Sequence, residues 1–163
     1  MDVLIVYGTY SGGTFEVAKE VERLLKEKGH KTTLQNIIDT SPTGAYEFRA
    51  DDLLEQMKSH DLVILGSCTW FEDGAEGQMH SGFRSFEKKI ADKSFNDMKF
   101  ALYGLGDTNY IHFCGAVDHL EKLVTSRKGN LIAPSLRIDR YYTNAKEISG
   151  NVKAWVDKLL KSV

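Results

Sequence analysis

The sequence predicts a doubly wound α/β fold, in which helices cover both faces of a five-stranded parallel sheet. Short apolar, β-rich segments alternate with segments of helical periodicity from one end of the chain to the other, and this alternation is typical of parallel sheets with helical crossovers. The chain has 163 residues, 42% of them hydrophobic, which is enough for one domain with one core. We therefore expect a single domain over residues 1–163.

The predicted strands differ in polarity, and the differences indicate their places in the sheet. Lys31–Asn36 is the most polar and suits a sheet edge, whereas Leu62–Leu65 is a wholly apolar run, as expected of a central strand buried on both faces. Strict alternation of five strands with about five helices fits the strand order 2-1-3-4-5. The strands are Val3–Tyr7, Lys31–Asn36, Leu62–Leu65, Phe100–Tyr103 and Leu131–Ile138.

Amphipathic helices are predicted between these strands. The first ends before Gly29, and the turn-rich loop Thr40–Gly44 leads to a second near Asp51–Ser59. The third is expected over Phe83–Ile90. Apolar residues lie on one stripe of each remaining long helix: Val17, Ala18, Val21, Leu24 and Leu25 in the first, Ala116, Val117, Leu120, Leu123 and Val124 in the fourth, and Ile148, Val152, Trp155, Val156, Leu159 and Leu160 in the last, which Asn144 and Glu147 are expected to cap.

Composition and charge exclude several classes of protein. The net charge is −2, with basic and acidic residues interspersed, so neither a nucleic acid nor a membrane is expected as a partner. No apolar run approaches the roughly 20 residues that span a bilayer, and the N-terminus lacks the features of a signal peptide. The two cysteines, Cys68 and Cys114, lie far apart and form neither a CxxC motif nor a Cys/His cluster, so we expect no metal site and a cytoplasmic location.

The loops that follow strands one, three and four carry the unusual residues. In doubly wound sheets, ligands bind at the carboxyl ends of the strands, where the strand order reverses. The first loop, Gly8–Thr14, joins a strand directly to a helix and is rich in glycine and hydroxyl groups. Its backbone N–H groups and the helix dipole are suited to a phosphate, although such a loop is also found as a plain polar turn. It lacks the lysine of a Walker A motif, which favours holding a phosphate over transferring one.

The other two loops place aromatic side chains at the same edge of the sheet. Trp70 and Phe71 follow the most buried strand within the long loop Gly66–Gly77, and Tyr110 lies near Asp107 in the loop Gly104–Gly115. Aromatic residues in surface loops are often lids on the local core, but a planar ligand accounts for them equally well. Two aromatic loops beside a phosphate loop indicate a site for a flat, phosphorylated molecule.

Three motifs make the chain resemble a known family. Thr9-x-Ser-Gly-x-Thr14, Ser67-x-Thr-Trp70 and Gly104-x-Gly-Asp-x-x-Tyr-x-x-Phe-Cys-Gly-Ala-Val117 are similar to the three FMN-binding loops of flavodoxins, in order and at suitable spacing. The resemblance covers essentially the whole chain. It implies a flavodoxin-like fold of the short-chain type, because the fifth strand lacks the insertion that marks long-chain members.

The resemblance also implies how FMN is held. The hydroxyls of the first loop and its N–H groups would hold the phosphate, Trp70 would pack on the inner face of the flavin ring, and Tyr110 would stack on its outer face. Asp107 and the backbone near Cys114 would bond the pyrimidine edge. No catalytic and no metal-binding residues are expected. The implied cofactor-binding residues are Thr9, Tyr10, Ser11, Gly12, Gly13, Thr14, Ser67, Cys68, Thr69, Trp70, Phe71, Gly74, Gly104, Asp107, Tyr110, Phe113 and Cys114.

The implied activity is that of a low-potential one-electron carrier. Ring stacking, together with the carboxylates of Glu72, Asp73, Glu76 and Asp107, would disfavour extra negative charge on the reduced flavin. The same carboxylates would form a local acidic patch on a chain that is less acidic than most flavodoxins. The implied partners are redox proteins, such as a ferredoxin/flavodoxin-NADP reductase and low-potential acceptor enzymes, and the chain is expected to be a monomer.

Other functions on the same fold remain alternatives. An FMN-dependent NAD(P)H reductase would need a second nucleotide site, for which the sequence has no motif, and an activator of a ribonucleotide reductase is a further alternative. Phosphoacceptor receiver domains are disfavoured, because they gather Asp residues at the strand ends. Here the first strand ends in Tyr7 and the third in Gly66.

Phe71 departs from the family pattern, because flavodoxins generally have a small or flexible residue after the tryptophan. In that family the peptide of this residue flips on one-electron reduction and turns its carbonyl towards flavin N5. The flipped turn favours positive φ, where a Cβ costs about 1–2 kcal/mol. We therefore expect Phe71 to lower the first midpoint potential, unless Gly74 takes over its role. For His80, His112, Tyr141 and Tyr142, solvated side chains or covers of the core edge are the simpler interpretation.

Overall fold

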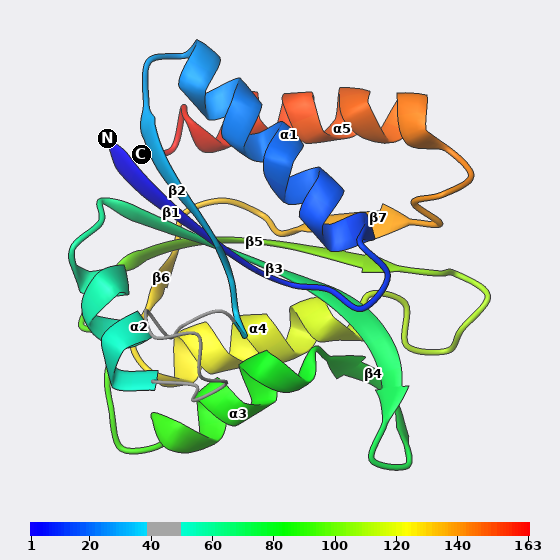
Figure 1. The fold of residues 1–163 in the computed structure, drawn as a ribbon, viewed down its shortest axis with the longest axis horizontal. Coiled ribbons are helices and arrows are strands. Elements are labelled where there is room, and N and C mark those ends of the chain that lie inside the picture. The colour runs from blue at the N-terminus through cyan, green and yellow to red at the C-terminus, as the bar shows by residue number, and fades with distance from the viewer. Residues whose placement is uncertain (39–49) are drawn as a thin grey trace.

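A central sheet with helices on both faces forms the architecture of the computed structural model, which describes residues 1–38 and 50–163 (Figure 1). The expected loop Thr40–Gly44 lies outside these residues. The strands are β1 Asp2–Gly8, β2 Lys31–Asn36, β3 Leu62–Glu72, β4 Ala75–Met79, β5 Lys99–Gly106, β6 Asn130–Leu131 and β7 Leu136–Asp139. The helices are α1 Gly13–Glu27, α2 Ala50–Lys58, α3 Ser81–Lys89, α4 Gly115–Ser126 and α5 Ala145–Leu159.

The parallel strands lie in the predicted order. The sheet runs β2-β1-β3-β5-β6, with β7 also pairing with β5 and β4 pairing antiparallel with β3. Val3 lies opposite Leu62, and Val63 opposite Phe100, so the apolar centres of three strands are in register. The polar strand β2 forms one edge, as its composition predicted. The order 2-1-3-4-5 is therefore confirmed for the parallel core, with β5 as its fourth strand and β6 as its fifth.

Alternate residues of the strands supply two separate cores. Leu4, Val63 and Leu102 face α2, α3 and α4, whereas Ile5 and Ile64 face α1 and α5. Successive side chains of a strand point to opposite faces, and full burial of both sets explains why the strands are continuously apolar. Figure 1 shows α1 and α5 on one side of the sheet and α3 and α4 on the other.

The loop predicted after the third strand is instead a β-hairpin. β3 continues through Trp70 and Phe71 to Glu72 and then pairs with β4. Asp73 (φ 52°) and Gly74 (φ 77°) make the two-residue turn. Two consecutive positive φ values define a type I′ turn, for which Asp-Gly is a preferred sequence. The dipeptide was thus a signal for this hairpin, and the prediction of an irregular loop over Gly66–Gly77 was wrong.

Two smaller expectations also need correction. The fifth strand, predicted over Leu131–Ile138, is split into β6 and β7, because Pro134 lies between them and has no N–H for the ladder. The Pro134 carbonyl instead accepts a hydrogen bond from the Trp155 indole (2.9 Å). Asn144 does precede α5, but its side chain makes no capping hydrogen bond, so the predicted capping box is not formed.

The carboxyl ends of β1, β3 and β5 lie toward the right of Figure 1, on the side of the β3–β4 hairpin, and residues 1 and 163 lie on the opposite side. The three loops predicted to bind a ligand therefore share one edge of the sheet, as the parallel arrangement requires.

Candidate functional site

The first loop presents free donors at the start of α1. Gly12 is the residue before the helix, with φ 91°, and α1 has no side-chain cap. The Thr9 hydroxyl accepts a hydrogen bond from the Gly12 N–H (2.9 Å), so this hydroxyl is engaged in shaping the loop. The next N–H groups of the first turn have no carbonyl partner within the helix. A helix that begins in this way is suited to an anion.

Thr14 has a buried hydroxyl that is suited to a ligand group. Its side chain is 1% exposed, yet its hydroxyl has no hydrogen-bond partner among the residues that the structure describes. The Thr14 carbonyl, in contrast, accepts a hydrogen bond from the buried Tyr103 hydroxyl (3.0 Å). A buried hydroxyl without a partner is costly, so this position fits a group that supplies an acceptor, such as a phosphate oxygen.

The β3–β4 hairpin forms the second wall of the site. Trp70 and Phe71 are 49% and 66% exposed, respectively, although both are large and apolar. Phe71 lies within β3 and does not have a positive φ; the positive values belong to Asp73 and Gly74. The cost expected at Phe71 concerns the flipped peptide of the reduced flavoprotein, so it stays a prediction.

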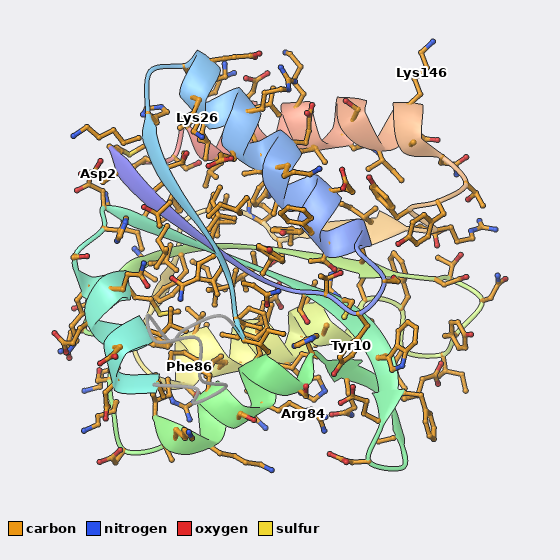
Figure 2. The ribbon with its side chains drawn as sticks, in the orientation of Figure 1. Asp2, Tyr10, Lys26, Arg84, Phe86 and Lys146 are labelled. Carbon is orange, nitrogen blue, oxygen red and sulfur yellow. The ribbon has the colours of Figure 1, made fainter. Side chains whose placement is uncertain are left out.

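An arginine on α3 holds the tip of this hairpin. The Arg84 guanidinium forms ion pairs with both Glu72 and Asp73, and Figure 2 shows Arg84 on the α3 side of the molecule. Glu72 is largely covered, whereas Asp73 is exposed. The expected acidic patch is thus partly neutralised, because two of its four carboxylates are paired with this cation.

The third loop, between β5 and α4, is tied to the hairpin. The Glu76 carboxylate accepts a hydrogen bond from the Ile111 N–H (3.1 Å), and the Thr69 hydroxyl accepts one from the Ala116 N–H (3.3 Å). Within the loop, the Asp107 carboxylate accepts a hydrogen bond from the Asn109 N–H (2.8 Å). The hairpin that carries Trp70 and the loop that carries Tyr110 therefore form one unit.

A cleft of about 1020 Å³ lies between these walls, at the upper end of the range for small-molecule sites. The predicted cofactor residues that line it are Ser11, Thr14, Cys68, Thr69, Trp70, Phe71, Asp107 and Tyr110. The predicted residues outside this lining are Thr9, Tyr10, Gly12, Gly13, Ser67, Gly74, Gly104, Phe113 and Cys114. The structure thus brings residues of all three loops together around one cavity.

Several of the outlying residues have structural contacts. The Ser67 hydroxyl accepts a hydrogen bond from the His80 N–H (2.9 Å), which links β3 to the start of α3. A Cβ on Gly104 would lie 2.4 Å from a methyl group of Val117, so this glycine permits close packing of α4 on β5. The Tyr10 hydroxyl accepts a hydrogen bond from the Ser81 N–H (3.0 Å). Figure 2 shows Tyr10 at the hairpin end of the molecule.

His80 is buried beneath Tyr10, where sequence reasoning assigned it no part. Its ring centroid lies 4.2 Å from that of Tyr10, and its Nδ1 accepts a hydrogen bond from the Gly82 N–H (3.1 Å). Burial lowers the pKa of His80, while a hydrogen bond to the backbone of Thr9 opposes this shift. The neutral imidazole therefore joins the first loop to α3.

Both cysteines are buried and free. Burial raises the pKa of the Cys68 thiol to about 11 and that of the Cys114 thiol to about 12. The Cys114 thiol faces the backbone, with Sγ 3.6 Å from the Gly104 carbonyl oxygen. Thiols in this state are protonated at neutral pH and act as packing groups.

A fourth wall was not foreseen from the sequence. The segment Arg140–Thr143, between β7 and α5, lines the cleft, and it includes the two tyrosines interpreted as covers of the core edge. That interpretation fits Tyr141, which packs on the α1–α5 core. Tyr142 is 67% exposed, so it does not cover the core edge. Asn109 and His112 also line the cleft.

Two further properties concern the described part of the chain. No helix there is both long enough and apolar enough to cross a membrane. Nor do residues 1–38 and 50–163 contain a group of three His, Cys, Asp or Glu side chains placed to hold a metal ion.

The fold and the cleft define a doubly wound α/β domain whose cleft is bordered by the uncapped start of α1 and by aromatic side chains. Comparison with known proteins gives the family: the flavodoxin family model matches residues 5–155. A flavodoxin of Nitratidesulfovibrio vulgaris (strain DSM 19637 / Miyazaki F) is 30% identical over 162 residues, which cover 99% of each chain. The chain belongs to the flavodoxin family and is an FMN-binding electron carrier.

Solved structures agree with this fold. Oxidised flavodoxin 2 from Bacillus cereus superimposes with a TM-score of 0.81 at 24% identity and covers all of both chains. A short-chain flavodoxin associated with a non-canonical PDU bacterial microcompartment superimposes with a TM-score of 0.78 at 22% identity, over 99% of this chain and 97% of that one. The short-chain form of the fold, expected from the sequence, is thus confirmed.

Proposed function

We propose that FMN lies in this cleft with its phosphate on the first loop and its ring between Trp70 and Tyr110. The observation that carries the proposal is the Thr14 hydroxyl, which is buried and without a partner among the described residues. It lies at the free N-terminus of α1 and borders a cleft that both aromatic side chains also line. A phosphate oxygen at this point would satisfy the hydroxyl and meet the positive end of the helix dipole.

The proposed residues divide the work of holding the cofactor. Thr9 shapes the loop through Gly12, while Ser11, Thr14 and the first-turn N–H groups face the phosphate. Trp70 and Tyr110 exclude water from the ring. Bound FMN supplies one-electron redox chemistry, and apolar aromatic walls disfavour added negative charge on it. We accordingly propose a low-potential carrier.

Replacing Thr14 by valine tests the assignment, because it removes the hydroxyl and keeps the shape. Losing one hydrogen bond to a charged group should weaken FMN binding about 10- to 150-fold. The apoprotein should be as stable as wild type or more stable, since a buried unpaired hydroxyl is removed. Thr125→Val, on the exposed end of α4, is the matched control and should leave FMN affinity unchanged.

Fluorescence titration with FMN and urea unfolding of the apoprotein measure the two quantities. Unchanged FMN affinity in Thr14→Val would remove the phosphate from this loop. A purified protein whose visible spectrum and released cofactor indicated FAD would contradict the proposal as a whole.

We also propose that the partners are redox proteins that dock at the exposed rim of the cleft. Phe71 and Ile111, from the two joined loops, are 66% and 88% exposed. With two nearby carboxylates paired to Arg84, attraction to a basic partner would be weak and apolar contact would dominate. A ferredoxin/flavodoxin-NADP reductase as donor and low-potential enzymes as acceptors fit this surface.

Stopped-flow electron transfer from such a reductase tests the partner proposal. The rate should depend only weakly on ionic strength, and Ile111→Glu should slow it more than Lys161→Glu, a substitution near the far terminus. A steep fall of the rate with salt would contradict an apolar docking surface.

We further propose that the protein is a single-domain monomer in the cytoplasm. The two free, buried thiols support the cytoplasmic location. Sedimentation of the holoprotein tests the monomer. Mixing it with NADPH alone separates carrier from reductase, and bleaching of the flavin without a reductase would contradict the proposed role.

A further inference from the structure

Tyr142 makes a contact that packing does not explain. Its hydroxyl oxygen lies 2.6 Å from the Ser11 carbonyl oxygen and 3.2 Å from Ser11 Oγ, across 131 residues of sequence. The side chain is 67% exposed, so burial of the ring does not hold it there. The contact joins the β7–α5 segment to the phosphate loop.

The segment that carries Tyr142 is anchored independently of this contact. The Arg140 N–H donates to the Gly106 carbonyl (2.9 Å), and the Thr143 N–H and hydroxyl both donate to the Arg140 carbonyl (3.0 Å each). Arg140 has φ 43°, a conformation that non-glycine residues adopt only when their surroundings impose it. The backbone around Tyr142 is therefore held in place by hydrogen bonds that do not involve Ser11.

The proton arrangement at this contact follows from the groups present. A phenol has one proton to donate, and a carbonyl oxygen only accepts. Tyr142 therefore donates to the Ser11 carbonyl, and its oxygen can accept from the Ser11 hydroxyl at the longer distance.

The contact fixes one end of a peptide whose other end is also held. The Ser11 carbonyl and the Gly12 N–H belong to the same planar trans unit and point in opposite directions. Tyr142 binds the carbonyl, and the Thr9 hydroxyl binds the N–H (2.9 Å). With both ends held, Gly12 keeps its φ of 91°, and the first turn of α1 keeps its orientation toward the cleft.

We propose that Tyr142 is a positioning residue for the phosphate of FMN, acting by holding the Ser11–Gly12 peptide. The inference rests on the proposed function of the first loop and assigns this residue to phosphate selectivity. The position of Gly13 supports the geometry, because a Cβ built on this glycine would lie 3.3 Å from the Tyr142 hydroxyl. The hydroxyl thus lies directly beside the first residue of the helix.

The ratio of riboflavin to FMN dissociation constants tests the role, because riboflavin has the same ring and lacks the phosphate. Tyr142→Phe removes only the hydroxyl. It should raise the dissociation constant of FMN about three- to tenfold and leave the dissociation constant of riboflavin unchanged. Thr125→Val is the comparison, because it removes an exposed hydroxyl on α4 that lies outside the residues lining the cleft. It should leave the ratio at the wild-type value.

Each outcome is decisive. An equal loss for both flavins in Tyr142→Phe would mean that the segment packs against the ring, and no loss for either would mean that the contact does not serve the cofactor. Both results would overturn the proposal. Failure of the underlying site assignment looks different, because Thr14→Val would then leave FMN affinity unchanged.

Discussion

Gly12 and Gly29 offer a matched pair of substitutions at the two ends of α1. Their φ values are 91° and 81°, and a Cβ at either position would meet nothing within 4 Å among the residues that the structure describes. The cost of alanine at each site is therefore conformational alone. A side chain with a Cβ in the left-handed region costs about 1–2 kcal/mol, which for a chain of this length lowers the melting temperature by roughly 2–8 °C.

Only one of the two substitutions should impair the cofactor site. Relaxation of the strained turn at Gly12→Ala would move the peptide that Thr9 and Tyr142 hold and would cost at least one hydrogen bond to the phosphate. FMN affinity should fall about 10- to 150-fold. Gly29→Ala, beyond the other end of the helix, should destabilise the fold to a similar extent and bind FMN as wild type does.

Thermal unfolding of the apoproteins and FMN fluorescence titration give the two numbers. If Gly29→Ala loses as much affinity as Gly12→Ala, then affinity follows general stability, and the argument from loop geometry is refuted. It is refuted equally if Gly12→Ala unfolds at the wild-type temperature, because the positive φ would then carry no cost.

Three other substitutions probe the remaining walls. Tyr110→Ala should weaken FMN binding and make the second midpoint potential less negative, since water would reach the reduced flavin ring. Spectroelectrochemistry measures this potential, and an unchanged value would mean that the Tyr110 ring only covers the local core. Arg84→Gln should destabilise the protein by about 1–3 kcal/mol in urea titration. It should also make the second midpoint potential more negative, because Glu72 and Asp73 lose their cation, and a less negative potential would contradict this reasoning. His80→Asn keeps an acceptor for the helix start and removes a titrating group. Because burial lowers the pKa of His80 below its ordinary 6.5, the unfolded chain binds the proton first. Wild-type stability should therefore be full above pH 6.5 and fall as the pH drops toward the folded pKa, and a variant with the same pH profile would show that His80 is not responsible.

Most of the fold could be predicted from local sequence patterns. The strand β2 has the predicted bounds, Lys31–Asn36, and the buried stripe of α1 includes Val17, Val21 and Leu25 as expected. Periodicity reports which side chains are buried, and burial determines where strands and helices lie. The three loops met at one edge because parallel strands place their carboxyl ends together.

What the sequence did not predict depends on contacts between distant segments. Arg84 pairs with Glu72 and Asp73 only because α3 packs beside the hairpin, and no local pattern indicates how that helix is rotated. Tyr142 and Ser11 meet across 131 residues. The hairpin is the exception, because the Asp73-Gly74 dipeptide is itself a local signal for a two-residue turn.

The position of the two chain ends affects how the protein can be attached to a surface. Residues 1 and 163 lie on the side of the sheet opposite the hairpin (Figure 1). From the start of β3 to Trp70 is about 25 Å along the strand, at roughly 3.3 Å per residue. A tether at either end therefore leaves the cleft facing the solution. On an electrode, a protein immobilised in this way would exchange electrons with diffusing partners more readily than with the metal beneath it.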